Sequence, residues 1–189
     1  NLLFPTPIWT IQLNNFENIN EGMFNFIKET QRKDKRGIKR SNNKGWHSKD
    51  FDMKKAEPQT FIKNISPSIE KVMTDMNWEK EKQSIKISNM WAIINTGGST
   101  NSRHQHGNST ISAAYYVRAP QNCGDIVFYD PRPAPVYAYP NAVKPNLLNA
   151  QVNGIAPKEG ALVLFPSYLD HSVNENTSNE ERIVVSFNI

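Results

Sequence analysis

Residues 104–118 read HQHGNSTISAAYYVR, where two histidines one residue apart stand directly before a run rich in β-forming residues. From Ser84 onward, more short runs of this kind are separated by Gly, Pro, Asn and Asp, a pattern typical of a β-sandwich or barrel. We therefore expect strands in Ile85–Asn95, Thr110–Arg118, Asp125–Tyr129, Pro135–Ala138, Gln151–Asn153, Ala161–Phe165 and Arg182–Phe187.

The part of the chain before Ser84 has a helical texture. Apolar residues at helical spacing predict one amphipathic helix over Glu17–Thr30. A second is expected from Gln59 or Ser66 to Asn77, with Pro67 tolerated in its first turn. The fold class predicted is mainly β: a double-stranded β-helix, or cupin-like jelly roll, buttressed by N-terminal helices. We expect a single domain over 1–189, with 1–83 as helical support and basic loop and 84–189 as the core.

The amino-acid composition indicates the cellular compartment. Cys123 is the only cysteine, so an intrachain disulfide framework is excluded and a reducing compartment is the simpler interpretation. No stretch approaches the roughly 20 apolar residues that cross a bilayer, and the first residues lack the order of a signal peptide. These features predict a cytoplasmic protein without membrane contact.

The net charge is +4, and much of the positive charge is local: seven of the residues from Arg32 to Lys44 are Lys or Arg. Such a run is usually a solvated loop. The alternative is an electrostatic guide for an acidic partner or nucleic acid. Because no aromatic residue lies inside the run to stack on a base, nucleic acid is the less favoured partner.

The histidines carry the strongest chemical signal. On an extended backbone, residues i and i+2 point to the same side, so His104 and His106 can grip one cation; otherwise they are two solvated histidines in a polar loop. His171 follows the buried run 160–166, and in a jelly roll it can supply a third ligand from across the barrel. Three ligands on one face of an octahedron leave the other face open for substrate or oxygen.

Several pieces of the sequence occur in an order that resembles the 2-oxoglutarate and Fe(II)-dependent oxygenases, near the prolyl-hydroxylase branch and similar to a small bacterial and phage group. The resemblance covers about Trp91 to Ile189. The pieces are His104-Gln105-His106, Ala114-Tyr115-Tyr116-Val117, Gly124 to Arg132, Gly160 to His171 and Glu181 to Asn188.

The resemblance implies a role for each matching residue. His104 matches the first metal histidine of the family and His171 the distal one. Arg182 matches the basic residue that pairs with the outer carboxylate of 2-oxoglutarate, and Tyr116 a tyrosine that shares this carboxylate. The alternative interpretation is that neither residue binds a co-substrate: Arg182 is then a surface arginine at the start of a strand, and Tyr116 is an aromatic residue of the core.

The sequence departs from the family pattern at one ligand. The usual second ligand is an Asp or Glu two residues after the first histidine, and His106 stands there instead. His106 can itself complete a three-histidine site. Alternatively, His106 is the first ligand, His104 lies outside the coordination sphere, and the carboxylate comes from Asp130 or Asp125. In a third interpretation the site binds metal without oxidation.

The leading hypothesis is an Fe(II)- and 2-oxoglutarate-dependent dioxygenase that hydroxylates a small-molecule or protein substrate. Two alternatives stay open: a cupin-like three-histidine dioxygenase or isomerase that does not use 2-oxoglutarate, and a non-catalytic β-sandwich binding module. We expect Trp91 in the core and give His47, in a loop after Trp46, little chance of touching the metal. The sequence defines neither the substrate nor the oligomeric state.

Overall fold

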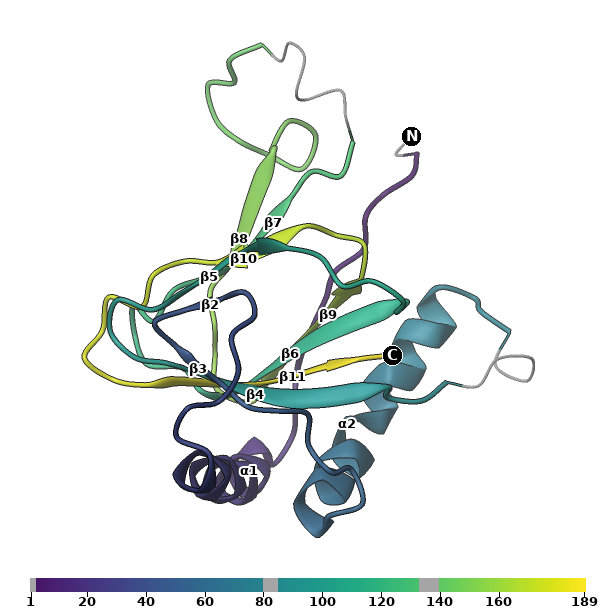
Figure 1. The fold of residues 1–189 in the computed structure, drawn as a ribbon. Coiled ribbons are helices and arrows are strands. Elements are labelled where there is room, and N and C mark those ends of the chain that lie inside the picture. The colour runs from purple at the N-terminus through teal and green to yellow at the C-terminus, as the bar shows by residue number, and fades with distance from the viewer. Residues whose placement is uncertain (1–2, 80–84, 133–139) are drawn as a thin grey trace.

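Two antiparallel sheets and two helices make up the computed structural model, which describes residues 3–79, 85–132 and 140–189 (Figure 1). The larger sheet has the strand order β1 (Trp9–Gln12), β9 (Ala161–Pro166), β6 (Ile111–Arg118), β11 (Arg182–Asn188), β4 (Asn89–Asn95) and β3 (Trp46–His47). The smaller has the order β2 (Asn42–Asn43), β5 (Thr100–His104), β10 (His171–Val173), β7 (Ile126–Tyr129) and β8 (Val152–Ile155). The predicted mainly β jelly roll is confirmed.

Both helices cover the outer face of the larger sheet (Figure 1). Helix α1 spans Phe16–Lys33 and helix α2 spans Ala56–Asp75. Helix α2 begins earlier than expected, so Pro67 lies inside it and not in its first turn. Within the described residues, no helix is both long enough and apolar enough to span a membrane.

Strand β11 shows how the larger sheet serves two cores at once. Successive strand residues point to opposite faces. Ile183, Val185 and Phe187 therefore pack with the helices in the outer core. The alternate residues of β11 face the space between the two sheets, where they line a cavity: Arg182, Val184, Ser186 and Asn188.

Several strands were not expected from the sequence. Strands β5 and β10 read TNSRH and HSV, short polar stretches without the alternation that identifies a half-buried strand. They are strands because each pairs with neighbours in the smaller sheet. Strands β2 and β3 were missed because each has only two residues, and β1 (WTIQ) because it lies before the β-rich part of the sequence. The expected strand Pro135–Ala138 lies outside the described residues.

The basic segment is more ordered than the predicted solvated loop. Within it, β2 pairs with β5 through Asn42↔Asn101 and Asn43↔Thr100. The Ile38 N–H also donates to the His47 carbonyl at 2.9 Å. The short ladder and this hydrogen bond hold the segment across one end of the barrel, and Ile38 and Arg40 help to line the cavity between the sheets.

Gly160 makes the turn into β9 and can be tested directly. Its φ is +76°, and a Cβ at this position would lie 2.2 Å from Cγ of Phe16. We expect Gly160→Ala to lower the free energy of unfolding by at least about 1–2 kcal/mol, from the left-handed backbone alone. The exposed helical Gly22 has nothing within 4 Å of such a Cβ. Gly22→Ala should therefore raise stability by about 0.5–1 kcal/mol in the same urea titration; equal effects would contradict this account.

Candidate metal centre

Three histidines converge inside the barrel. Strand pairing sets His104, at the end of β5, directly against His171, at the start of β10. His106 lies two residues beyond β5, and its backbone N–H donates to the Ser167 carbonyl at 3.0 Å. One nitrogen from each ring lies within 4.8 Å of the others. The third ring thus comes from the neighbouring strand and not, as the sequence suggested, from across the barrel.

Backbone hydrogen bonds orient two of the rings. Nδ1 of His104 lies 2.7 Å from the Ser102 carbonyl, and Nδ1 of His171 lies 3.0 Å from the Leu169 carbonyl. A carbonyl can only accept, so each Nδ1 must carry the proton. Nε2 of each ring then keeps its lone pair, which is the arrangement that metal-binding histidines need.

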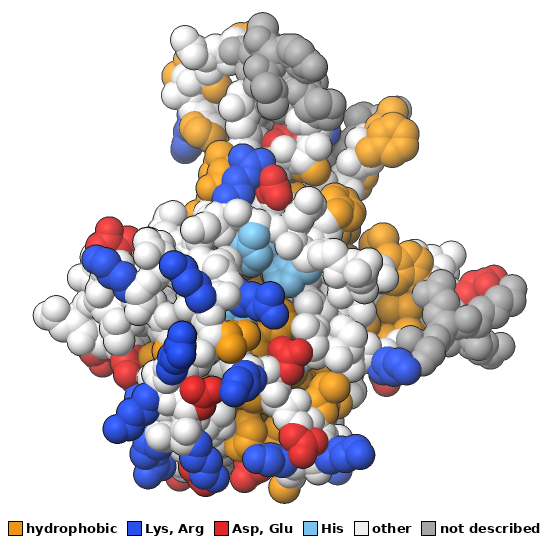
Figure 2. Space-filling model, viewed as in Figure 1, with side chains coloured by type: hydrophobic (Ala, Val, Ile, Leu, Met, Phe, Trp, Pro, Cys, Tyr) orange, Lys and Arg blue, Asp and Glu red, His pale blue; other side chains and the backbone are white. Residues whose placement is uncertain are grey.

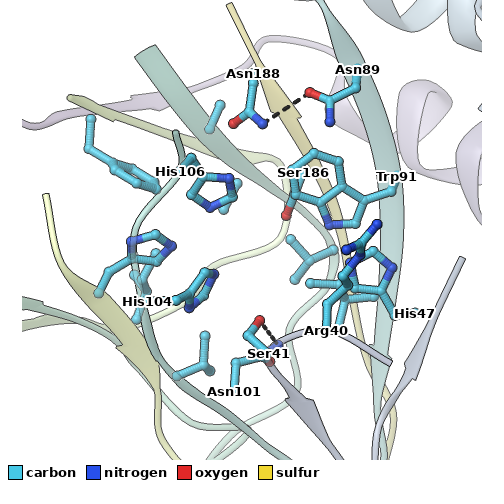
Figure 3. Close-up of a pocket in the computed structure, with 18 of the residues that line it drawn as sticks. Arg40, Ser41, His47, Asn89, Trp91, Asn101, His104, His106, Ser186 and Asn188 are labelled. Atoms are coloured by element: carbon cyan, nitrogen blue, oxygen red, sulfur yellow. Dashed lines mark hydrogen bonds between the residues drawn. The ribbon is translucent and has the colours of Figure 1, made fainter. Parts of the chain in front are cut away.

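Stacked rings fix the position of His106 (Figure 3). Its ring lies 5.7 Å from that of Trp91 with an interplanar angle of 22°, and 5.1 Å from that of His171 at 8°. On its other side Trp91 stacks against His47 at 5.7 Å and 8°. His47 was given little part in the site, yet the stack places it in the cavity wall. Only tertiary structure reveals this contact.

An ion pair ties together the two strands that carry His104 and His171. Arg103 donates through Nε at 2.9 Å and Nη2 at 2.6 Å to Oδ2 of Asp170. The Arg103 guanidinium also lies 4.1 Å from the centre of the Tyr129 ring. Because these residues are next to the histidines in sequence, the contact limits how far the two rings can separate. The sequence pattern gave no sign of this pair.

Burial keeps the imidazoles neutral. It lowers the pKa of His106 to about 4 and that of His171 to about 3, and neighbouring histidines add to both effects. The pKa of His104 is lowered too, chiefly by burial. Neutral rings are ready to bind a cation without first losing a proton.

A buried cation lies in the same cavity, whose volume is about 270 Å³. Arg182 is 2% exposed, and its Nη1 donates to the carbonyls of Gly124 at 2.9 Å and Cys123 at 3.4 Å. Among the described residues, its Nε has no hydrogen-bond partner. In the described part of the chain, no carboxylate lies within ion-pair distance of this guanidinium.

Tyr116 lines the cavity beside this arginine and is 2% exposed. Burial raises the pKa of its phenol, although the charge of Arg182 opposes the shift. The hydroxyl is therefore protonated at neutral pH and can donate a hydrogen bond. Together, Arg182 and Tyr116 form a donor-rich end of the cavity.

The two candidate carboxylates do not join the histidine cluster. Asp130 accepts hydrogen bonds from the Arg132 side chain, with Oδ2 2.6 Å from Nη2, and this arginine lowers its pKa. Oδ2 of Asp125 lies close to Gly154 of β8. Among the described residues, the cluster that can hold a metal consists of the three histidines.

Residues 89–188 match a protein family described as "Putative 2OG-Fe(II) oxygenase". This match covers more than half of the chain. The chain belongs to the 2OG-Fe(II) oxygenase family. It is an oxidoreductase whose cofactors are Fe(II) and 2-oxoglutarate. The resemblance seen in the sequence is confirmed, and membership decides against both the cupin-like alternative and the non-catalytic module.

Solved structures share the fold of this oxygenase at low sequence identity. A Pseudomonas putida prolyl-4-hydroxylase superposes with a TM-score of 0.66 and 10% identity, covering 97% of this chain and 92% of that one. The viral collagen prolyl hydroxylase of Paramecium Bursaria Chlorella virus-1 superposes with a TM-score of 0.60 and 14% identity, covering 95% of this chain and 93% of that one. The epimerase SnoN of nogalamycin biosynthesis superposes with a TM-score of 0.67 and 9% identity, covering 94% of this chain and 74% of that one. No curated protein matches the oxygenase.

The buried imidazoles should make the metal-free oxygenase sensitive to acid. In the unfolded chain His106 and His171 titrate near their ordinary pKa of about 6.5. In the folded chain the pKa is about 4 for His106 and about 3 for His171. Unfolded protein therefore binds more protons below pH 6.5, and the free energy of unfolding should fall as pH drops from about 6.5 to 4.

Urea titrations at several pH values measure this slope. The double variant His106→Asn, His171→Asn lacks the two shifted groups and should lose less stability over the same range. An unchanged slope in that variant would show that other residues cause the acid sensitivity.

Proposed function

We propose that His104, His106 and His171 hold the Fe(II) of this oxygenase, and that Arg182 and Tyr116 hold 2-oxoglutarate. The observation that carries this proposal is the convergence of three neutral imidazoles and one unpaired buried guanidinium in a single cavity. The first group suits a divalent transition metal, and the second suits a carboxylate. The cavity therefore offers both partners that the cofactors need.

The metal ligands are argued from the donor set. His104 and His171 each have Nδ1 engaged by a backbone carbonyl, which leaves Nε2 for the metal. His106 is held in place by Trp91 and completes the cluster. Asp130 is already neutralised by Arg132. These contacts favour the three-histidine interpretation over a carboxylate ligand.

The 2-oxoglutarate site is argued from the buried charge. An arginine that is 2% exposed and bonded only to backbone carbonyls lacks a partner that would neutralise it. The outer carboxylate of 2-oxoglutarate supplies that charge, with the Tyr116 hydroxyl as a further donor. Apolar walls from Ile126, Phe165 and Val184 exclude water around the pair.

The bound cofactors supply the oxidising chemistry, in which oxygen is reduced while 2-oxoglutarate is converted to succinate and carbon dioxide. The chain itself orients the reacting groups and keeps water out. We infer that the substrate is bound on the side of the histidines opposite Arg182, before the oxidation takes place. We infer a hydroxylation, as in the prolyl hydroxylases that share the fold.

The setting inferred from the sequence stays a proposal. We place the oxygenase in the cytoplasm of a bacterium or in a phage-infected cell, as one domain over 1–189. The supporting observation is Cys123, which is free and buried. Burial raises the pKa of its thiol, which suits an unreactive cysteine in a reducing compartment.

Loss of any one ligand should abolish iron binding. We expect His104→Ala, His106→Ala and His171→Ala each to weaken Fe(II) affinity by more than about 100-fold, because replacement of residues outside the coordination sphere already costs 10–100-fold. Anaerobic calorimetry measures the affinity, and circular dichroism checks the fold. Asp130→Asn is the matched control and should bind as the wild type does. Normal binding by His106→Ala together with lost binding by Asp130→Asn would move the third ligand to Asp130.

Removal of the buried guanidinium should affect the co-substrate alone. Arg182→Leu leaves the outer carboxylate buried and unpaired, a loss of about 3–5 kcal/mol, so the dissociation constant of 2-oxoglutarate should rise by roughly two to four orders of magnitude. Iron affinity should stay close to that of the wild type. Arg118→Leu, which removes an exposed arginine paired with Glu159, provides the control. Equal 2-oxoglutarate affinity in both variants would disprove the proposed site.

A further inference from the structure

The cavity has a buried inner end and an exposed outer end. Arg182 and Tyr116 form the inner end, and the histidine cluster follows it. Arg40 and Asp50 are exposed residues of the lining; Arg40 comes from the segment that crosses the barrel end, and Asp50 follows β3. Arg40 therefore lies where the cavity meets solvent, and Figure 3 shows it near His47 and Trp91.

The backbone around Arg40 is fixed while its side chain is free to bind. Its N–H donates to Oδ1 of Asn42 at 2.8 Å, and Nδ2 of Asn42 donates to the Gly45 carbonyl at 2.7 Å. The pairing of β2 with β5 anchors the same turn. Within the described residues the Arg40 guanidinium has neither an ion-pair partner nor a side-chain hydrogen bond.

Ser41 adds a second donor at this end. Its Oγ accepts a hydrogen bond from Nδ2 of Asn101 at 3.2 Å, and both residues line the cavity. Because that bond uses an acceptor position of the hydroxyl, the Ser41 O–H can donate to a ligand. A guanidinium and a hydroxyl on adjacent residues suit an anion.

The charges of the loaded site also favour an anion. Fe(II) and dianionic 2-oxoglutarate cancel, and the three proposed ligands are neutral. Asp50 offsets one of the two arginines in the lining, so one positive charge remains. A carboxylate ligand in place of His106 would have removed it. Figure 2 shows further Lys and Arg side chains gathered on the face where the histidines open to solvent.

We propose that the substrate carries a carboxylate or phosphate group and that Arg40, assisted by Ser41, binds this group at the outer end of the cavity. The inference rests on the proposed cofactor site. Arg40 is thereby a specificity-determining residue: it fixes the anionic end of the substrate while the part to be oxidised lies beside the histidines. The basic segment steers such a substrate toward the opening.

The opposite wall of the cavity is polar but neutral. Nδ2 of Asn188 donates to Oδ1 of Asn89 at 3.0 Å, and Oδ1 of Asn188 accepts from Ser112 at 2.8 Å (Figure 3). The Asn188 amide thus has partners for both its Nδ2 and its Oδ1, and neither asparagine carries a charge. A substrate with one anionic end therefore has a single favourable orientation, with that end at Arg40.

Paramagnetic relaxation tests the inference without turnover. The protein is loaded with Mn(II) and 2-oxoglutarate, so that Arg182 is covered, and the ³¹P relaxation of methyl phosphate and the methyl proton relaxation of acetate are followed during titration. Neutral trimethyl phosphate is the uncharged probe. Arg40→Gln is compared with Arg40→Lys and with Lys39→Gln, which removes a neighbouring charge outside the lining.

We expect saturable relaxation enhancement for at least one of the two anions and none for trimethyl phosphate. Whether methyl phosphate or acetate gives it identifies the anion. Arg40→Gln should raise the dissociation constant tenfold or more, Arg40→Lys less, and Lys39→Gln little. Equal binding in Arg40→Gln and wild type would overturn the inference, because the anion would then be bound elsewhere. The inference would also be overturned if neither anion bound to the wild-type protein loaded with Mn(II) and 2-oxoglutarate. Failure of Mn(II) or 2-oxoglutarate to bind would instead disprove the proposed cofactor site, and the inference with it.

Discussion

The antiparallel pairing of β5 with β10 is the constraint on which the site depends. It sets His104 directly opposite His171, so the distance between these two rings follows from sheet geometry and not from loop conformation. The ion pair of Arg103 with Asp170 reinforces the same pair of strands beside the rings. The proposed metal site can therefore exist before a metal binds, because the backbone already holds the two histidines in place.

Burial then determines the chemistry of the assembled groups. The histidines stay neutral and Tyr116 stays protonated because charged forms are costly in a cavity closed by two sheets. Arg182 is the exception, since a guanidinium cannot give up its proton in this range of pH. The inner end of the cavity consequently keeps a positive charge that an added anion can neutralise. In the proposed site, different residues therefore bind the co-substrate and the metal.

The sequence predicted the fold class because β6, β9 and β11 are long apolar strands buried on both faces. It also identified the three histidines and Arg182 as candidates, through spacing and family resemblance; their roles stay proposals. Strands β5 and β10 could not be found, since their polar residues become strands only by pairing with neighbours. For the same reason the sequence could not place Arg40 at the cavity: the two-residue ladder of β2 decides its position.

In the part of the chain that the structure describes, the Arg182 guanidinium is held by backbone carbonyls of the turn at Cys123 and Gly124. Side-chain identity in that turn is therefore largely irrelevant to the anchor, and homologous sequences could vary there without loss of the arginine's partners. Gly124 is the exception: its φ is +89°, and a Cβ would lie 2.2 Å from the Asn174 carbonyl oxygen. The hydrogen bonds to Arg182 thus place no demand on the side chains of the turn, whereas the burial of Cys123 and the positive φ of Asn122 and Gly124 limit what can replace these residues. Substitutions beside the proposed co-substrate pocket should therefore be limited by packing and backbone conformation, and not by the contact with Arg182.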